Sequence, residues 1–372
     1  MEEARPILLA AGGTGGHLFP AEATAAALAR RGLDAELATD DRALKYGGVS
    51  CFRRVHQIPS ATPRGGSVLA RSAAVLELAR GTIAALALLR RMRPRCVVGF
   101  GGYPTVPPVL AASFMRIPCI LHEQNAVMGR ANRFLARRVD RIAAGFPSLA
   151  DKAGGLRSKI EHTGNPLRPA VLAAAALPYP DFAEGALRLL VTGGSQGARI
   201  LSEIVPAAVE RLSPTLRAGL RIVQQARSED EEAVRQTYAR LGVEAQVAAF
   251  FADLPAQMAA SHLVIARAGA STVSELAAIG RPCILVPFPF ALDQDQAANA
   301  ATLAASGAAQ VIAQSAFTTE WLAEALQRAM AEPEGLTRRA RAAKSAGIAD
   351  AAERLADLVI GLTTIAGSSE KA

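Results

Sequence analysis

Cysteine, aromatic side chains and long apolar runs are all scarce in this chain of 372 residues. The four cysteines are widely spaced and form no CxxC pair, which argues against a zinc ribbon or a disulfide framework and favours buried, reduced thiols. Aromatic residues make up 5% of the chain and do not alternate with basic ones, so no stacking platform for RNA is indicated. We therefore expect no nucleic-acid partner.

The longest apolar stretch, residues 68–89, is interrupted by Arg71, Glu77 and Arg80. A membrane-spanning helix needs about 18 or more apolar residues, so we expect no spanning segment. The stretch continues to Arg95 with further arginines. This composition is typical of a helix lying on an anionic bilayer, and equally of a core helix with a solvated basic end.

Charge is distributed unevenly along the chain. Residues 1–165 contain 23 Lys and Arg against 12 Asp and Glu, whereas the rest contains 18 against 21. The formal net charge of +8 therefore comes from the first half. Because a basic surface attracts anionic partners, the first half is predicted to meet an anionic membrane surface.

Short β-type runs alternate with helical runs, which predicts an α/β protein with two doubly wound parallel sheets. A Pro- and Ala-rich stretch at 164–186 indicates the connection between two domains. Strands are predicted near 6–10, 34–38, 95–100, 118–122, 140–145, 187–192, 220–225, 244–249, 262–266, 282–286 and 309–312. Helices are predicted near 18–31, 69–92, 105–115 and 127–137, between the later strands, and over 333–365.

Two glycine-rich turns, at 12–17 and 193–198, each join a predicted strand to a predicted helix. Glycine allows a tight turn and a close approach to the backbone, and a helix N-terminus favours an anion. Two such turns in equivalent places predict paired nucleotide-binding domains that face a cleft. His17 ends the first turn, where the helix dipole disfavours the protonated imidazolium, so His17 is a candidate general base.

Further polar or glycine-rich segments follow other predicted strands of the first half. The turn at 99–104 would bring Tyr103 near the ligand. The run from His122 to Asn125 suits a polyhydroxylated ligand, although Asn125 is also a good N-cap for the next helix. Arg168 is able to clamp a phosphate, or else belongs to a surface linker.

The second half carries two comparable segments. Residues 267–275 offer backbone N–H groups and hydroxyls to a diphosphate. Thr272 to Glu275 also fits a capping box, which spacing alone favours over a contact between Glu275 and a ribose. Residues 293–295 look like a DxD motif, but two carboxylates without further ligands are weak evidence for a metal.

Six motifs in a fixed order resemble the family 28 glycosyltransferases of the GT-B class, which transfer N-acetylglucosamine from UDP-GlcNAc to lipid-linked N-acetylmuramyl-pentapeptide. The motifs are GGTGGH at 12–17, GFGGYPTVPPVLAA at 99–112, HEQNAVMGRANR at 122–133, TGNPLR at 163–168, GGSQGAR at 193–199 and GASTVSELAAIGRP at 269–282. The resemblance covers residues 6 to at least 300. It implies a GT-B fold of two Rossmann-like domains facing a cleft.

The resemblance implies that the two halves of the chain bind different substrates. Residues 1–165 would bind the acceptor and the membrane, with a helix at about 348–365 returning to them, and residues 166–347 would bind UDP-GlcNAc. The implied partners are UDP-GlcNAc, undecaprenyl-linked lipid I, the cytoplasmic face of the plasma (inner) membrane, where the protein would be peripheral, and cell-wall synthesis proteins.

Site residues carry over from the resemblance as well. Glu275 is thereby assigned to the ribose, and Asp295 replaces a histidine that many relatives have. The implied catalytic residues are His17 and, in reserve, Glu123, with Gly102 and Tyr103 on the acceptor side. The implied UDP-GlcNAc-binding residues are Thr14, Gly15, Gly16, Asn125, Arg168, Ser195, Phe251, Ala270, Ser271, Thr272, Val273, Ser274, Glu275 and Gln296.

The predicted reaction is an inverting transfer of GlcNAc to the C4 hydroxyl of lipid I, which gives lipid II and UDP without a metal or other cofactor. The alternatives are a UDP-sugar epimerase or another GT-B glycosyltransferase. A dinucleotide-dependent oxidoreductase is disfavoured because neither turn gives a clean GxGxxG followed by an acidic residue. A non-catalytic basic adaptor would not need polar clusters after so many strands.

Overall fold

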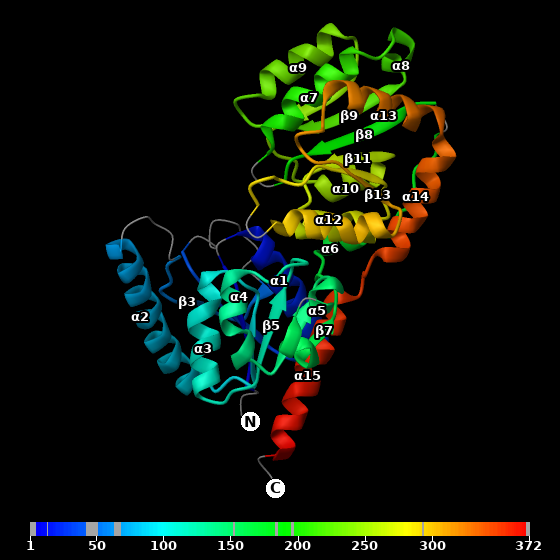
Figure 1. Ribbon diagram of the computed structural model, residues 1–372. Coiled ribbons are helices and arrows are strands. Elements are labelled where there is room, and N and C mark those ends of the chain that lie inside the picture. The colour runs from blue at the N-terminus through cyan, green and yellow to red at the C-terminus, as the bar shows by residue number, and fades with distance from the viewer. Residues whose placement is uncertain are drawn as a thin grey trace. The chain divides into compact units, whose positions relative to one another are not determined.

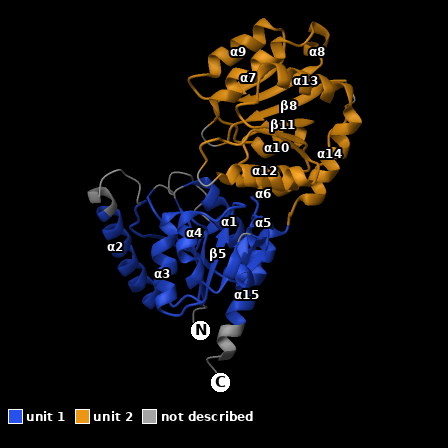
Figure 2. Ribbon diagram, in the orientation of Figure 1, with its two compact units in different colours: residues 1–168, 350–372 blue, residues 169–349 orange. Residues whose placement is uncertain are grey.

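The computed structural model describes residues 5–12, 14–41, 51–62, 68–151, 153–182, 185–194, 197–291 and 294–369. The chain forms two compact units, shown in different colours in Figure 2. Unit 1 consists of residues 1–168 and 350–372, and unit 2 of residues 169–349. The sequence had placed this boundary after residue 165, so Arg168 lies in unit 1 rather than with the second domain.

Unit 1 is built on a seven-stranded parallel sheet of order β3-β2-β1-β4-β5-β6-β7 (Figure 1). Its strands are β1 (Ile7–Ala10), β2 (Ala35–Thr39), β3 (Val55–Gln57), β4 (Cys96–Gly99), β5 (Cys119–Glu123), β6 (Arg141–Ala144) and β7 (Ile160–His162). Its helices are α1 (Gly15–Arg30), α2 (Val68–Met92), α3 (Val106–Phe114), α4 (Arg130–Leu135), α5 (Ser148–Asp151) and α15 (Ala351–Ser369), with 3-10 turns at Tyr103–Thr105, Ala136–Arg138 and Gly154–Lys159.

Side-chain alternation divides the core of unit 1 into two layers. In β1, Ile7 and Leu9 join a buried cluster with residues of α1 and α15, whereas Leu8 and Ala10 join a second cluster with residues of α2 and α3. This is the period of two expected of a strand covered by helices on both faces.

The last helix, α15, packs against α1 within unit 1. Leu355, Ala356 and Val359 contribute to the buried cluster. At the rim, Arg31 donates through Nη2 to Asp357 at 2.8 Å, and both Arg30 and Arg31 pair with Glu353. Apolar burial supplies most of the attachment, because ion pairs this exposed add little.

Unit 2 is built on a six-stranded parallel sheet of order β10-β9-β8-β11-β12-β13. Its strands are β8 (Leu187–Thr192), β9 (Leu220–Gln225), β10 (Glu244–Ala248), β11 (Leu263–Ala266), β12 (Cys283–Leu285) and β13 (Ala309–Val311). Its helices are α6 (Pro169–Ala175), α7 (Arg199–Glu210), α8 (Pro214–Ala218), α9 (Glu231–Arg240), α10 (Leu254–Ala260), α11 (Ala270–Ile279), α12 (Asp295–Ala305), α13 (Thr319–Ala331) and α14 (Pro333–Ala346).

The predicted fold class is confirmed, and the differences are local. The edge strands β3 and β7, of three residues each, were not predicted from the sequence. The segment read as an interdomain connection contains α6, which packs on α10 and α11 and buries Val171 completely. The helix predicted at 127–137 begins only at Arg130 and continues as a 3-10 turn.

The apolar stretch of α2 also departs from expectation. Residues Ser72–Met92 form a helix that is long and apolar enough to cross a membrane by length and composition. The expectation of no such segment was therefore wrong by that measure, because alanine and leucine outweigh the scattered charges. One face of α2 packs on α3 and buries Ala85 and Leu89, while Val75, Leu76 and Ile83 on the same helix are exposed.

Candidate active site

Each sheet reverses its strand order at one strand. In unit 1 this strand is β1, which pairs with β2 and β4, and in unit 2 it is β8, which pairs with β9 and β11. Ligands of open parallel sheets bind beyond the carboxyl ends of the strands at such a switch point. The two predicted glycine-rich turns leave β1 and β8, so each lies at the switch point of its own unit.

The turn after β1 places His17 in the first turn of α1. Thr14 is the N-cap residue, and Gly15 and Gly16 are the first two helical residues. Nδ1 of His17 lies 3.2 Å from the carbonyl oxygen of Gly12 and 3.2 Å from Oγ1 of Thr14. A carbonyl oxygen only accepts, so this contact assigns the proton of a neutral ring to Nδ1 and leaves the lone pair on Nε2. Nε2 is then the proton acceptor that a general base requires.

A second glycine turn, after β4, lies against the His17 ring. Gly101 and Gly102 have φ values of 84° and 73°, and a Cβ atom on either would come within 3.4 Å of the imidazole. Oγ1 of Thr105 donates to the Gly101 carbonyl at 2.6 Å and is 3.1 Å from that of Ala10, which ties this turn to β1. Tyr103 begins the 3-10 turn that follows and packs, partly buried, against the core of unit 1.

Glu123, the reserve base, ends β5 and is only 2% exposed. Its carboxylate accepts from the backbone N–H of Asn125 at 3.0 Å, from that of Gly129 at 2.9 Å and from Nδ2 of Asn132 at 2.8 Å. Burial raises the pKa of Glu123, and these hydrogen bonds oppose the rise. Since its oxygens are used to hold the segment between β5 and α4, the geometry favours His17 as the base.

The residues around Glu123 also bond mainly to the protein itself. His122 is fully buried, its Nε2 donates to the Gly164 carbonyl at 3.1 Å, and burial lowers its pKa to about 4. Gln124 donates to the Phe100 carbonyl at 2.7 Å. The interpretation of this run as a set of ligand-binding side chains therefore holds at most for the partly exposed Asn125. The alternative of Asn125 as an N-cap is wrong, because Gly129 precedes α4.

Arg168 is the last residue of the first segment of unit 1. Its guanidinium carbon lies 4.5 Å from the centre of the Phe19 ring, a cation–π geometry. The positive charge of Arg168 also acts on Glu22, whose pKa is nevertheless raised to about 7, chiefly by burial. Arg168 is thus held by α1 rather than being a loose linker residue.

In unit 2, Gln225 holds the turn that follows β8. Its Oε1 accepts from the hydroxyl of Thr192 at 2.9 Å and from the N–H of Gly193 at 3.1 Å, and its Nε2 donates to the Gly194 carbonyl at 2.9 Å. A Cβ atom on Gly193 would lie 2.3 Å from the backbone nitrogen of Ala198, so no side chain fits there. Gln225 is not among the site residues that the sequence predicts. Ser195 lies outside the described residues.

The helix α11 begins directly after the strand next to β8. Gly269 is its N-cap residue and has no side chain with which to cap the helix, so the first N–H groups of the helix are suited to an incoming acceptor. These groups belong to Ala270, Ser271 and Thr272. A capping box from Thr272 to Glu275 is wrong, because the helix has already begun before Thr272.

The remaining predicted donor residues of unit 2 lie on neighbouring loops and helices. Val273 and Glu275 lie inside α11 and are buried, and Ser274 between them is partly exposed. Oε1 of Gln296 accepts from the N–H of Ala268 at 3.2 Å and from that of Phe288 at 3.0 Å, which joins the loops after β11 and β12. Phe251 is buried just after β10, whereas its neighbour Phe250 is exposed.

No group of three or more His, Cys, Asp or Glu side chains is placed to hold a metal ion within the described residues. Asp295, in the DxD-like run, accepts through Oδ1 from the N–H of Gln296 at 2.7 Å and begins α12. Asp293 lies outside the described residues. That catalysis proceeds without a metal stays a prediction.

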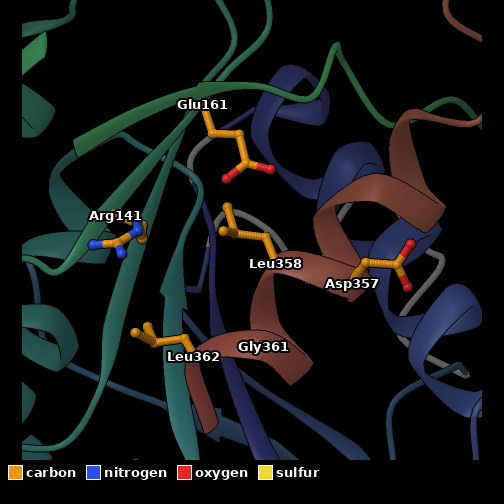
Figure 3. A pocket seen from close by; sticks show the side chains of 6 residues that line it. All are labelled: Arg141, Glu161, Asp357, Leu358, Gly361 and Leu362. Carbon is orange, nitrogen blue, oxygen red and sulfur yellow. The ribbon is translucent and has the colours of Figure 1, made fainter. Parts of the chain in front are cut away.

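Two cavities of unit 1 lie away from these residues. One of about 330 Å³ is lined by Arg141 and Glu161 from β6 and β7 and by Asp357, Leu358, Gly361 and Leu362 from α15 (Figure 3). Another of about 210 Å³ is lined by Arg5, Arg53, Arg54 and Arg91, among others. None of the predicted site residues lines either of these two cavities.

The two parallel sheets and their switch-point turns form the GT-B fold, and comparison with known proteins places the chain in the class of GT-B glycosyltransferases. Residues 7–144 match the glycosyltransferase family 28 N-terminal domain, and residues 188–355 match the family 28 C-terminal domain. The chain belongs to glycosyltransferase family 28.

Individual relatives make this assignment more specific. Over 367 residues the chain is 59% identical to the UDP-N-acetylglucosamine–N-acetylmuramyl-(pentapeptide) pyrophosphoryl-undecaprenol N-acetylglucosamine transferase of Methylobacterium nodulans, covering 97% of this chain and 98% of the relative. A crystal structure of Acinetobacter baumannii MurG is similar with a TM-score of 0.78 and 30% identity, covering 96% of this chain and 99% of that one. The UDP-GlcNAc 2-epimerase of Neisseria meningitidis, at 13% identity and a TM-score of 0.70 over 96% of this chain and 100% of its own, shares the fold.

Proposed function

We propose that this enzyme transfers N-acetylglucosamine from UDP-GlcNAc to the C4 hydroxyl of undecaprenyl-pyrophosphoryl-MurNAc-pentapeptide, with inversion at the anomeric carbon. The names of the relatives that match nearly the whole chain give the transfer of N-acetylglucosamine between this donor and this acceptor. The observation in the structure that supports it most directly is the uncapped N-terminus of α11 beside the glycine turn of β8. Such a pair of elements suits the diphosphate of a nucleotide sugar.

The proposed reaction breaks the bond between the anomeric carbon and the diphosphate oxygen of UDP-α-GlcNAc and forms a β-(1→4) glycosidic bond. Nε2 of His17 takes the proton of the attacking hydroxyl, since Nδ1 is engaged by Gly12 and Thr14. UDP leaves with the bonding electron pair. The N–H groups at the start of α11 stabilise the charge that develops on the diphosphate, which is why no metal is invoked.

The reaction is tested by following UDP release from UDP-GlcNAc together with the mass of a lipid I analogue. Acceptor-dependent release with a gain of one GlcNAc by the analogue is the expected result. UDP release without an acceptor would instead indicate an epimerase or a hydrolase, and tight UDP binding without turnover would indicate a nucleotide-sensing protein.

We further propose that α2 attaches the enzyme peripherally to the anionic cytoplasmic face of the plasma membrane. Val75, Leu76 and Ile83 are 60%, 64% and 68% exposed, an unusual amount of apolar surface for one helix. Arg80 on the same helix is also exposed, as are Arg90 and Arg91 at its basic end. An apolar face flanked by arginines is the pattern of a helix that lies in the interface of an anionic bilayer. The opposite face of α2 packs on α3, which favours a surface-bound helix over a spanning one.

A further inference from the structure

Two arginines follow the strands that flank β8 in unit 2. Arg267 comes directly after β11, and Arg227 comes two residues after β9. β9 and β11 both pair with β8, so the carboxyl ends of all three strands meet at one edge of the sheet. Two positive charges are thus added to the edge that already carries the glycine turn of β8 and the N-terminus of α11.

Arg227 lies over the end of the glycine turn. A Cβ atom placed on Gly197 would be 2.9 Å from Cγ of Arg227, so the absence of a side chain at Gly197, whose φ is 67°, makes room for the arginine stem. Nε of Arg227 is buried and has no hydrogen-bond partner among the residues that the structure describes. Nη1 is 3.7 Å from Oε1 of Glu229, and both of these side chains are exposed. A pair at that distance and exposure neutralises Arg227 only weakly.

Arg267 provides a second positive charge that is held in place. Its Nη1 donates to the carbonyl oxygen of Val286 at 3.0 Å and its Nη2 to Oε1 of Gln314 at 2.6 Å, both neutral acceptors. Burial lowers the pKa of Arg267, and the nearby charge of Arg227 lowers it further. The two guanidinium groups therefore repel each other, and a bound anion would relieve that repulsion.

We propose that Arg227 binds the diphosphate of the UDP moiety, in addition to the residues that the resemblance assigns to it. This inference rests on the proposed function, since it presupposes a UDP-sugar as the donor. Arg227 reaches the ligand through its planar guanidinium, which is suited to hydrogen-bond two phosphate oxygens at once. Arg267, whose terminal nitrogens Nη1 and Nη2 already donate to Val286 and Gln314, acts as a fixed charge that favours the same anion.

Calorimetric binding of UDP and of uridine to the intact enzyme tests the proposal. The variants are Arg227→Gln, Arg227→Lys and, as a matched control, Arg221→Gln. Arg221 lies on β9 at the opposite edge of the sheet and pairs with Glu244, so its replacement removes the same charge without touching the site. We expect Arg227→Gln to weaken UDP binding about tenfold or more, which is the size of one lost charge-assisted contact, and to leave uridine binding unchanged. Arg227→Lys should lie in between, and the control should resemble the wild type.

Retained uridine binding by Arg227→Gln would also show that this variant folds. Equal losses for UDP and uridine, or no loss for either, would overturn the role of Arg227. So would an increased KM for the lipid acceptor alone, which would assign the charge to the acceptor's diphosphate. If the wild-type enzyme transfers GlcNAc and the Arg227→Gln variant binds UDP as tightly as the wild type does, this inference is wrong. The proposed function is then unaffected. Absence of UDP binding by the wild type would overturn both.

Discussion

The turns after β1 and β8 have the same position in their sheets but present different chemistry. The β1 turn carries His17, held through Nδ1 by Gly12 and Thr14. The β8 turn is held by the amide of Gln225, and the chemistry near it comes from a helix N-terminus and from arginines. In the proposed mechanism, one scaffold thus supports proton transfer in unit 1 and anion binding in unit 2. The two turns differ in the groups that lie beside them, which are a histidine at the β1 turn and a helix N-terminus with two arginines at the β8 turn.

The sharpest test of this contrast is His17→Ala. If the β1 turn supplies the base, kcat should fall by about 100-fold or more, with little change in the KM for UDP-GlcNAc. Steady-state kinetics with a lipid I analogue measures both constants. Near-normal turnover by a folded variant would remove His17 from the mechanism and would direct attention to Glu123, despite the hydrogen bonds that its carboxylate accepts from Asn125, Gly129 and Asn132.

A second difference is where each unit buries a histidine: His122 of unit 1 lies on β5 next to Glu123, whereas His262 of unit 2 precedes β11, at the end of the strand away from the site. The pKa of His122 is lowered to about 4 in the folded protein, whereas its ordinary value is about 6.5. Between about pH 6.5 and pH 4 the unfolded chain therefore binds a proton that the folded chain does not. Stability should therefore fall as the pH decreases from about 6.5 toward 4. Between pH 7 and 5 we expect a loss of about 2 kcal/mol from this group. Urea unfolding of wild type and His122→Gln at both pH values measures it, and equal pH dependence in the two proteins would contradict the assignment.

On the unit 2 side, Glu275→Ala should weaken donor binding. A hydrogen bond from a ribose hydroxyl to a carboxylate contributes about 1.5–3 kcal/mol. Losing the equivalent of one such bond should therefore raise the KM for UDP-GlcNAc by about tenfold to 150-fold. The contrast with 2′-deoxy-UDP sharpens the result, because the variant should discriminate less between UDP and its deoxy form than the wild type does. A change in acceptor affinity alone would contradict a ribose contact.

The smallest expected effect concerns the surface of unit 1. Ile83→Glu places a charge on the exposed face of α2 and should weaken binding to anionic phosphatidylglycerol vesicles by about tenfold, since apolar burial and charge attraction both decrease. Leu177→Glu, at an exposed leucine of unit 2, is the matched control and should bind like the wild type. If the Ile83→Glu variant floats with the vesicles as the wild type does, α2 does not attach the enzyme to the membrane.

For the polar residues of the candidate site, the sequence predicts their positions in the fold but not their hydrogen-bond partners. The position of His17 after a strand and before a helix is visible in the sequence, because glycine runs mark such turns. The tautomer of His17 and the engagement of Glu123 are not, since they depend on carbonyl and amide groups whose orientation arises only on folding. The role of Gln225 was not predicted from the sequence, because Thr192, its partner at the end of β8, is 33 residues away in the chain. The two residues become neighbours only when β9 pairs with β8.

The sequence by itself determined the alternation of strands and helices, the fold class, the two glycine turns and the family. These follow from local periodicity, from turn residues and from the order of motifs, all of which are written along the chain. Only the tertiary structure decided that β3 and β7 extend the first sheet and that α6 packs in unit 2. It also decided that Gly129 rather than Asn125 precedes α4, that Gly269 rather than Thr272 precedes α11, and that Arg227 lies over Gly197. Strand register and side-chain packing join residues distant in the chain, so their contacts have no local signature in the sequence.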